Sequence, residues 1–518
     1  MPEYLAPGVY VEEAGKGPRP IEGVSTSTAG MAGQTERGPM VPRPVTSWTE
    51  YQRWYGGFFN RVPTANAARF LPYAVRGFFE NGGQRLFIAR VTPAGAATAF
   101  ADLPCHSGTA IVTAIGPGVW GNGILVRVRD ASLAVPGTAT ADWFRLTLLY
   151  YRNGGVEPDV IEDFDNLSPL ASDPSFEPFV VNGTSTLVTL SATGRPRNIP
   201  DTPGTRLQGG TGDGEPTDAD YLGASTLPLG QRQGLLALES IDEISLLTIP
   251  DDAVLPGLRS AIVQQCERLK DRFAIVSLIE GEDANAPLDS LQPPLVSGFG
   301  ACYLPWVRVA APHTPDGHVL VPANGHIAGI YARVDCERGV HKAPANEVVR
   351  GLTSISGVPP LSRPLDKRQQ DILNPRGIDV IRDFSVEGRG VRVWGARTMA
   401  VDPLWKYVNI RRLFIFIERS IDRGTRWVAF EPNHEPTWAA VRQSVTTFLR
   451  TVWRSGALMG VTEDEAFFVK CDRTTMTQED IDSGRLICVI GVAPAKPAEF
   501  AVLRIGQWTL DAGHPPPG

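Results

Sequence analysis

Several hallmarks of membrane and secreted proteins are missing from this chain of 518 residues. No apolar run has the length and composition of a membrane-spanning helix. The first residues, MPEYLAPGVYVEE, have neither the basic start nor the apolar run of a secretory signal. We therefore expect a soluble, cytoplasmic protein without direct membrane binding.

Cysteine is scarce and scattered. The six cysteines are Cys105, Cys266, Cys302, Cys336, Cys471 and Cys488. They form no CxxC pair, and the adjacent Cys105 and His106 would point to opposite faces of a strand. The sequence therefore predicts reduced, structural thiols, no metal site and no cofactor.

Common catalytic motifs are also absent. The sequence contains no GxSxG, no HExxH and no P-loop lysine. Asp251 and Asp252 follow an expected buried strand, where α/β folds place active sites, so a hydrolase remains an alternative. The net charge of −7 argues against a nucleic-acid-binding surface over the whole chain. We expect no enzymatic activity and no nucleic-acid partner.

The residues that are present indicate a large protein of several domains. Residues 23–92 predict an α/β unit with a strand in VSTSTAGMAG, helices in TSWTEYQRWYG and AARFLPYAVRGFFENGG, and a strand in RLFIARV. Residues 93–223 contain short β segments broken by glycine and proline, and predict a mostly β peripheral insertion. Its end, LQGGTGDGEPTDADYLG, fits neither a P-loop nor a calcium loop, which favours an acidic linker.

Helices and strands alternate in residues 224–375. GLLALESIDEISLLTIPD and SAIVQQCERLKDRFAIVSLIE each predict a helix followed by a buried strand, and ACYLPWVRVAAP predicts one further strand. This succession favours a largely parallel sheet.

An amphipathic helix is predicted after FEPN. Its apolar stripe consists of Trp438, Val441, Val445, Phe448, Leu449 and Val452. Arg442, Arg450 and Arg454 lie within about 120° of one another on such a helix. Two interpretations stay open: a solvated basic face, or a surface attracted to an acidic partner.

Both ends of the chain resemble strands without a partner. Val9, Tyr10 and Val11 form a β-prone run, and the glycines and prolines that follow prevent a helix. Residues 499–508 predict a strand with no following element to cover it. The N-terminal run either pairs with another chain or folds back as a local edge strand.

Eight segments carry a resemblance to a known family. They are LAPGVYVEE, PGVWGNGILVRV, VPANGHIAGIYARVDCERGVHKAPANEVVRG, LNPRGIDVIRDF, VWGARTM, YVNIRRLFIFIERSI, FEPN and GVAPAKPAEF. Together they resemble contractile tail sheath proteins of myophages and phage-tail-like injection systems. The resemblance is strongest from Tyr303 to Trp508 and weakest from Pro93 to Gly223.

The resemblance implies an α/β, multi-domain fold. Its expected parts are an N-terminal arm (1–22), the N-terminal part of an inner core domain (23–92), a mostly β insertion (93–223), a central subtilisin-like α/β domain (224–375), an α+β C-terminal domain (376–498) and a C-terminal arm (499–518).

The resemblance also implies a function. Such a subunit stacks as hexameric rings around an inner tube and contracts to drive the tube through a target envelope. The implied partners are further copies of the chain, an inner tube protein, and baseplate and terminator proteins. The implied location is a phage tail or tail-like particle, assembled in the bacterial cytoplasm. Another tail or baseplate protein is the alternative within this class.

In this family, arm strands of neighbouring subunits pair with a small sheet of a third subunit. The corresponding arm residues here are Val9, Tyr10, Val11, Phe500, Val502, Leu503 and Ile505. The accepting sheet would contain Leu486, Ile487, Val489 and Ile490. The tube-facing candidates are Arg442, Arg450 and Arg454.

Overall fold

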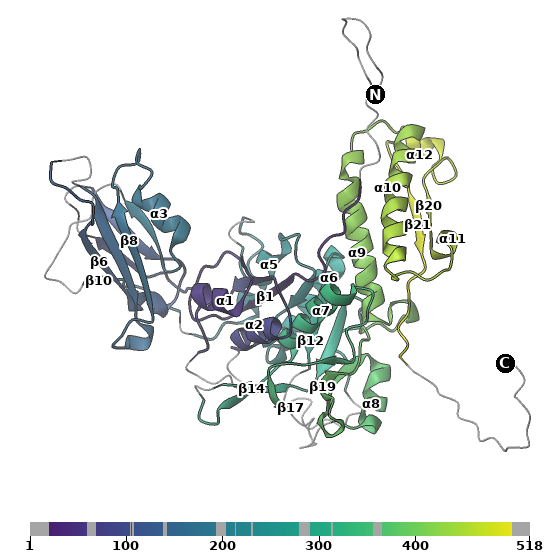
Figure 1. Ribbon diagram of the computed structural model, residues 1–518, viewed down its shortest axis with the longest axis horizontal. Coiled ribbons are helices and arrows are strands. Elements are labelled where there is room, and N and C mark those ends of the chain that lie inside the picture. Colours follow the sequence, from purple (N-terminus) through teal and green to yellow (C-terminus); the bar gives the residue numbers. More distant parts are fainter. Residues whose placement is uncertain are drawn as a thin grey trace, which may run out of the picture.

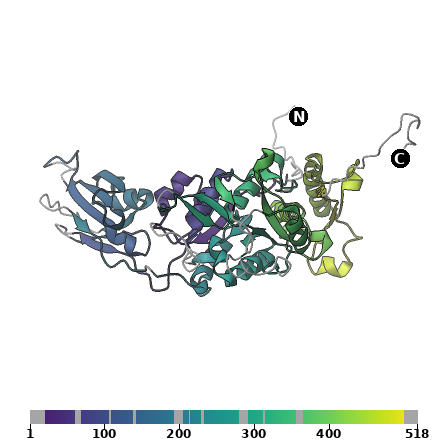
Figure 2. The same cartoon turned by 90° about the horizontal axis from the view of Figure 1, so that it is seen from below.

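In the computed structural model of the chain, the described residues are 20–59, 69–103, 105, 108–137, 142–192, 204–212, 214–228, 232–278, 291–311, 314–355 and 365–499. They form a mostly β domain, a central α/β domain and a C-terminal domain, which follow one another along the long axis of the molecule (Figures 1 and 2). The fold is therefore mixed α/β with several domains.

A nine-stranded sheet organises the central domain, in the order β16-β19-β18-β13-β12-β11-β1-β3-β2. The strands are β1 (Ala29–Gly33), β2 (Arg43–Val45), β3 (Leu86–Arg90), β11 (Leu246–Thr248), β12 (Phe273–Ser277), β13 (Gly300–Leu304), β16 (Glu347–Val348), β18 (Ile378–Phe384) and β19 (Gly390–Val393). From β18 to β3 every neighbouring pair is parallel. The predicted largely parallel sheet is confirmed.

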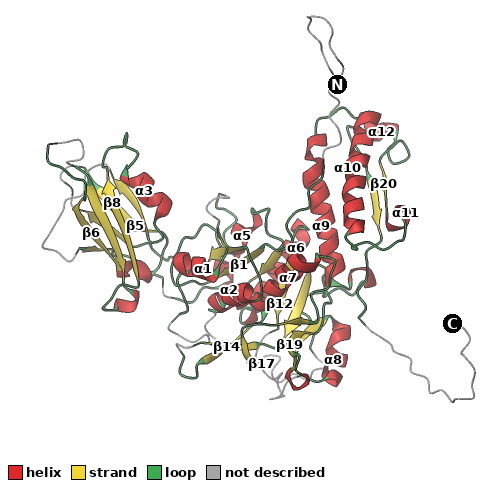
Figure 3. Cartoon of the chain, viewed as in Figure 1, coloured by secondary structure: helices red, strands yellow, loops and turns green. Residues whose placement is uncertain are grey.

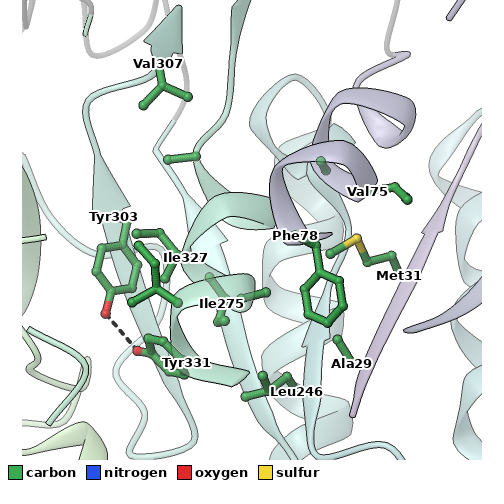
Figure 4. Close-up of a cluster of buried hydrophobic side chains, with 14 of the residues drawn as sticks. Ala29, Met31, Val75, Phe78, Leu246, Ile275, Tyr303, Val307, Ile327 and Tyr331 are labelled. Carbon is green, nitrogen blue, oxygen red and sulfur yellow. Dashed lines mark hydrogen bonds between the residues drawn. The ribbon is translucent and has the colours of Figure 1, made fainter. Parts of the chain in front are cut away.

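Helices cover both faces of this sheet, as Figure 3 shows. They are α1 (Trp48–Tyr55), α2 (Leu71–Glu80), α5 (Gly234–Glu239), α6 (Pro256–Leu269), α7 (Asn324–Arg338) and α8 (Lys367–Leu373). One buried core lies on each face. In the core on the side of α2 and α7, Phe78 approaches Met31, and the hydroxyls of Tyr303 and Tyr331 are hydrogen-bonded at 2.7 Å (Figure 4). Every residue of the inner strands β1, β3, β11, β12 and β13 is buried, which explains the continuous runs of mostly apolar residues in their sequences.

The central sheet crosses two of the expected domain boundaries. β1 and β3 come from residues 23–92, yet both pair in the same sheet as β11. β18 lies beyond the expected boundary at residue 375, yet it pairs with β13. Parallel strands pair across long sequence separations, so local sequence pattern does not reveal which segments share a sheet.

The segment ACYLPWVRVAAP differs from the prediction of one strand. It contains β13 and β14 (Val307–Ala310), which belong to different sheets. β14 pairs with β15 (His318–Val321) and β17 (Leu352–Ile355) in a small antiparallel sheet. Pro305 separates the two strands, and proline cannot donate a ladder hydrogen bond.

The mostly β domain has its own core between two antiparallel sheets. One sheet contains β4 (Phe100–Leu103), β5 (Ala110–Ala114) and β9 (Val188–Ala192); the other contains β6 (Ile124–Asp130), β7 (Phe144–Tyr150), β8 (Val160–Leu167) and β10 (Thr205–Arg206). Helix α3 (Glu177–Thr184) packs on β9, and α4 (Asp218–Leu222) leads back to the central domain.

The C-terminal domain stacks two long helices and a small sheet (Figure 1). Its elements are α9 (Val408–Thr425), α10 (Glu435–Arg454), α11 (Glu463–Ala466), β20 (Phe467–Lys470), α12 (Gln478–Asp482) and β21 (Val489–Val492). Every residue of the predicted apolar stripe on α10 is buried in the core of this domain, which confirms the stripe. α10 therefore lies between α9 and the β20–β21 sheet.

Helices α2 and α7 touch through backbone atoms. A Cβ atom added to Gly325 would lie 2.2 Å from the Ala74 carbonyl oxygen and 2.4 Å from its Cα atom. We expect Gly325→Ala to reduce the free energy of unfolding by about 1–3 kcal/mol, because the helices must separate. Gly183→Ala in α3 is the matched control, since nothing lies within 4 Å of its added Cβ. Equal thermal midpoints for the two variants would contradict the close contact.

Burial of His326 on α7 predicts acid sensitivity. Burial and the nearby Arg76 cation lower the pKa of His326 from 6.5 to about 4. The neutral ring is therefore favoured in the fold: its stabilising contribution is complete above pH 6.5 and is lost as the pH falls through 4. We expect the free energy of unfolding to fall by on the order of 3 kcal/mol as His326 becomes protonated in the unfolded and then in the folded chain. His326→Gln should flatten that part of the curve of thermal midpoint against pH; an unchanged curve would refute the role of His326.

Candidate assembly interface

Helix α9 carries the first described residues of the chain. Ile21 packs on Gly424 in the last turn of α9, and the Val24 amide donates to the Ser420 hydroxyl at 3.1 Å. The chain then enters the central sheet at β1. The described structure therefore begins at the C-terminal end of α9.

The last described residue, Glu499, is held at the opposite end of α9. Its carboxylate accepts hydrogen bonds from Arg397 Nε at 2.6 Å, Asn374 Nδ2 at 2.9 Å and the Tyr407 hydroxyl at 3.0 Å. Lys406 Nζ lies 3.4 Å away. Tyr407 is the residue that precedes α9. The chain therefore leaves the described structure from a fixed point at the N-terminal end of α9.

Electrostatics strengthen this attachment of Glu499. Burial alone would raise the pKa of its carboxyl group, but hydrogen bonds from Arg397 and Asn374 and the Arg397 charge lower it to about 2. The bond to Arg397 links Glu499 to the central sheet, because the Arg397 amide donates to Asp379 on β18 at 2.9 Å. A groove of about 1330 Å³ runs beside this junction and is lined in part by residues 495–499.

The two exit points are far apart. α9 has 18 residues, so its ends are separated by roughly 27 Å at about 1.5 Å per residue. The described structure thus begins and ends at well-separated points along α9.

β20 and β21 form an antiparallel pair, with Phe467 opposite Val492 and Lys470 opposite Val489. Within the described part of the chain, the sheet has only these two strands. Among the predicted accepting residues, Leu486 and Ile490 pack against the C-terminal core. Ile487 and Val489 are 37% and 42% exposed, and Phe468 on β20 is 49% exposed. The pair thus combines an anchored face with an apolar face open to solvent.

The three predicted arginines lie on α10 but differ in their surroundings. Arg450 donates to both carboxylate oxygens of Glu463, at 2.7 and 2.8 Å. Arg442 is exposed and donates to the Cys471 carbonyl at 3.3 Å. Arg454 is exposed in the last turn of the helix. The ion pair to Glu463, thirteen positions along the chain, partly neutralises Arg450 and could not be inferred from helical spacing.

The predicted arm residues lie outside the described residues. They are Val9, Tyr10, Val11, Phe500, Val502, Leu503 and Ile505. Phe468 and Glu499 were not among the predicted site residues. Glu499 was expected only as the first residue of the C-terminal arm, whereas the structure attaches it to Arg397, Asn374 and Tyr407.

Asp251 and Asp252, the candidate catalytic pair, are fully buried. Asp251 accepts hydrogen bonds from the Phe70 amide at 2.8 Å and the Tyr221 hydroxyl at 2.6 Å. Asp252 accepts from the Ser277 amide and from Asn324 Nδ2, each at 3.2 Å. Burial raises the pKa of Asp251 to about 6 and that of Asp252 to about 8. The pair links the turn after β11 to β12 and α7, and neither carboxylate is exposed to solvent.

Among the described residues, no group of three His, Cys, Asp or Glu side chains is arranged to hold a metal ion. In the same part of the chain, no helix combines the length and apolar character needed to cross a bilayer.

Comparison with known proteins identifies the family. Residues 214–399 match the phage tail sheath protein central domain, and residues 400–507 match the phage tail sheath C-terminal domain. The two matches cover more than half of the chain. The chain belongs to the phage tail sheath family.

Individual relatives agree with this assignment. The tail sheath protein of Escherichia phage P2 is 23% identical over 312 residues, which cover 58% of this chain and 74% of the relative. The tail sheath protein of Burkholderia phage BcepMu is 30% identical over 192 residues, which cover 35% of this chain and 38% of the relative. This chain is therefore a structural subunit of a contractile tail sheath, in a phage tail or a tail-like particle.

The fold of the chain is similar to that of solved sheath structures. The contracted helical sheath of the anti-feeding prophage has a TM-score of 0.57 and 24% sequence identity, and the alignment covers 98% of this chain and 100% of that chain. At this identity the likeness is one of fold.

The Glu499 attachment gives a direct test. We expect Glu499→Gln to speed hydrogen exchange in residues 493–499, because the variant loses the negative charge that Arg397 and Lys406 surround. Glu479→Gln on α12 is the matched control, since Glu479 is exposed. In the wild type the attachment should weaken only below pH 4.5, as the pH falls toward 2. Unchanged exchange in Glu499→Gln would show that the carboxylate does not hold this segment.

Proposed function

We propose that this subunit polymerises as stacked hexameric rings around an inner tube and contracts to drive the tube through a target envelope. In this proposal residues 9–11 and 500–505 are donated strands, and β20–β21 of another subunit accepts them. The exit of the two ends from opposite ends of α9 carries the proposal, because it directs them toward different neighbours.

The β20–β21 pair has the properties of an acceptor. A two-stranded sheet is marginal by itself and gains stability when strands are added at its edges. Exposed Phe468, Ile487 and Val489 would be covered by the side chains of such strands. Added strands bind mainly through backbone hydrogen bonds, so the connections can persist while whole domains rotate.

Arg442 and Arg454 are the tube-facing residues we propose, with Arg450 in a secondary role because of its ion pair to Glu463. Exposed charges of this kind attract an acidic surface weakly and are screened by salt. Such a contact suits a tube that must be released during contraction.

The work of contraction would come from repacking between subunits, without catalysis by this chain. The burial of Asp251 and Asp252 supports this view and disfavours a hydrolase. The parallel sheet of the central domain is compatible with the subtilisin-like fold implied by the resemblance. Baseplate and terminator proteins would be the partners at the two ends of the sheath, and assembly would take place in the bacterial cytoplasm.

Strand donation is tested at Tyr10. We expect Tyr10→Pro to abolish long sheaths in electron micrographs. Proline has no amide hydrogen to donate to a neighbouring strand, and its ring fixes φ at a value that disfavours a paired strand. Tyr10→Ala is the matched control and should still assemble, since backbone hydrogen bonds dominate this mode of binding. Deletion of residues 500–518, which leaves Glu499 in place, should also yield folded but unassembled subunits. Normal sheaths from either Tyr10→Pro or the deletion would refute the proposed arms.

A further inference from the structure

The two cysteines of the C-terminal domain face each other across the β20–β21 pair. Lys470 is opposite Val489, so the antiparallel register places the next residues, Cys471 and Cys488, in opposition. Directly opposed residues in such a ladder have Cα atoms about 4.5–5.5 Å apart, which lies within the range that a disulfide bridges. Both thiols are free, and they are hydrogen-bonded to each other.

Neighbouring groups hold the pair in place. The Thr475 hydroxyl donates to the Ile487 carbonyl at 2.9 Å, which fixes the backbone just before Cys488. Arg442 donates to the Cys471 carbonyl at 3.3 Å from α10. Cys471 is fully buried, whereas Cys488 is half-buried and is the member of the pair that solvent can reach.

The electrostatic environment distinguishes the two sulfur atoms. The hydrogen bond from Cys488 and the charge of Arg442 lower the pKa of Cys471. Hydrogen bonding to Cys471 and burial raise the pKa of Cys488. Cys471 therefore has the lower pKa of the two, and a thiolate is the form that attacks a disulfide.

We propose that Cys471 and Cys488 form a reversible disulfide bond that links the end of β20 to the start of β21. We call this bond the staple. This proposal does not depend on the proposed strand exchange between subunits, although both concern the β20–β21 sheet.

The oxidant we assign is a small disulfide such as oxidised glutathione. The accessible Cys488 attacks glutathione disulfide while its proton passes to the hydrogen-bonded Cys471 sulfur. A mixed disulfide forms on Cys488, and one glutathione thiolate leaves and takes up the proton from Cys471. The Cys471 thiolate then attacks Cys488 Sγ, the mixed disulfide breaks, and the second glutathione thiolate leaves. The two protein thiols lose two electrons and two protons, and one glutathione disulfide becomes two glutathione molecules.

The staple would stabilise an isolated two-stranded sheet. It closes a loop over residues 472–487, including α12, and fixes the register between β20 and β21. A reducing cytoplasm would keep the dithiol, whereas an oxidising exterior would favour the disulfide.

A peptide map tests the bond directly. The folded full-length chain is treated with oxidised glutathione, its remaining thiols are alkylated, and it is digested with trypsin without reduction. We expect the peptide Cys471–Arg473 to appear joined to Leu486–Arg504, with a mass two hydrogen atoms below the sum of the two, and to separate after reduction. Cys336→Ser is the matched control and should retain the linked pair, since Cys336 is exposed on α7.

Cys488→Ser should abolish the linked peptides. If glutathione stays on Cys488, or if disulfides form only through Cys336, the staple is refuted. We also expect oxidation to slow amide exchange in β20 and β21 by roughly tenfold or more in the wild type, and not in Cys488→Ser. Equal exchange in oxidised and reduced wild type would show that the bond does not stabilise the sheet.

Discussion

A buried ion pair fixes the C-terminal domain to the central sheet. Arg412 on α9 donates to Asp335 on α7 at 2.9 Å, and both side chains are almost completely buried. Arg412 also donates to the Thr26 carbonyl at 3.0 Å, just before β1. Removing one partner of such a pair leaves an uncompensated buried charge, at a cost of about 3–5 kcal/mol. This contact joins three distant segments and so sets the orientation of α9, from which both ends of the described chain depart.

The molecule therefore combines two kinds of contact. The central sheet is densely packed on both faces, and the α9–α7 junction is held by a buried ion pair. The β20–β21 pair, in contrast, shows apolar side chains to solvent and gains hydrogen bonds only from a further strand. If strands of other subunits are added there, as we propose, the subunits of a sheath can change orientation while those connections persist.

Sequence pattern predicted the features that depend on local periodicity. The stripe on α10 and the two helices and two strands predicted in residues 23–92 follow from apolar spacing, and the structure has them where the pattern placed them. The short edge strand β2 in the same residues was not predicted. The segment YVNIRRLFIFIERSI was recognised only by resemblance, and its helix, α9, was not assigned from spacing.

The features that depend on long-range pairing were not predictable. Nothing local to β18 indicates that it pairs with β13, and nothing near Arg450 indicates Glu463 as its partner. Glu499 gains its role from Arg397 and Asn374, more than a hundred residues earlier in the chain. The register that opposes Cys471 and Cys488 likewise requires the paired strands.

The central claim concerns the fate of the β20–β21 sheet in the assembled particle. A cryo-electron microscopy reconstruction of sheaths grown from the full-length chain measures it most directly. We predict that β20 and β21 lie within a larger sheet, with residues 9–11 and 500–505 of other subunits as the added strands. A helical sheath in which β20 and β21 remain a two-stranded pair, and the arms contact only their own subunit, would contradict it.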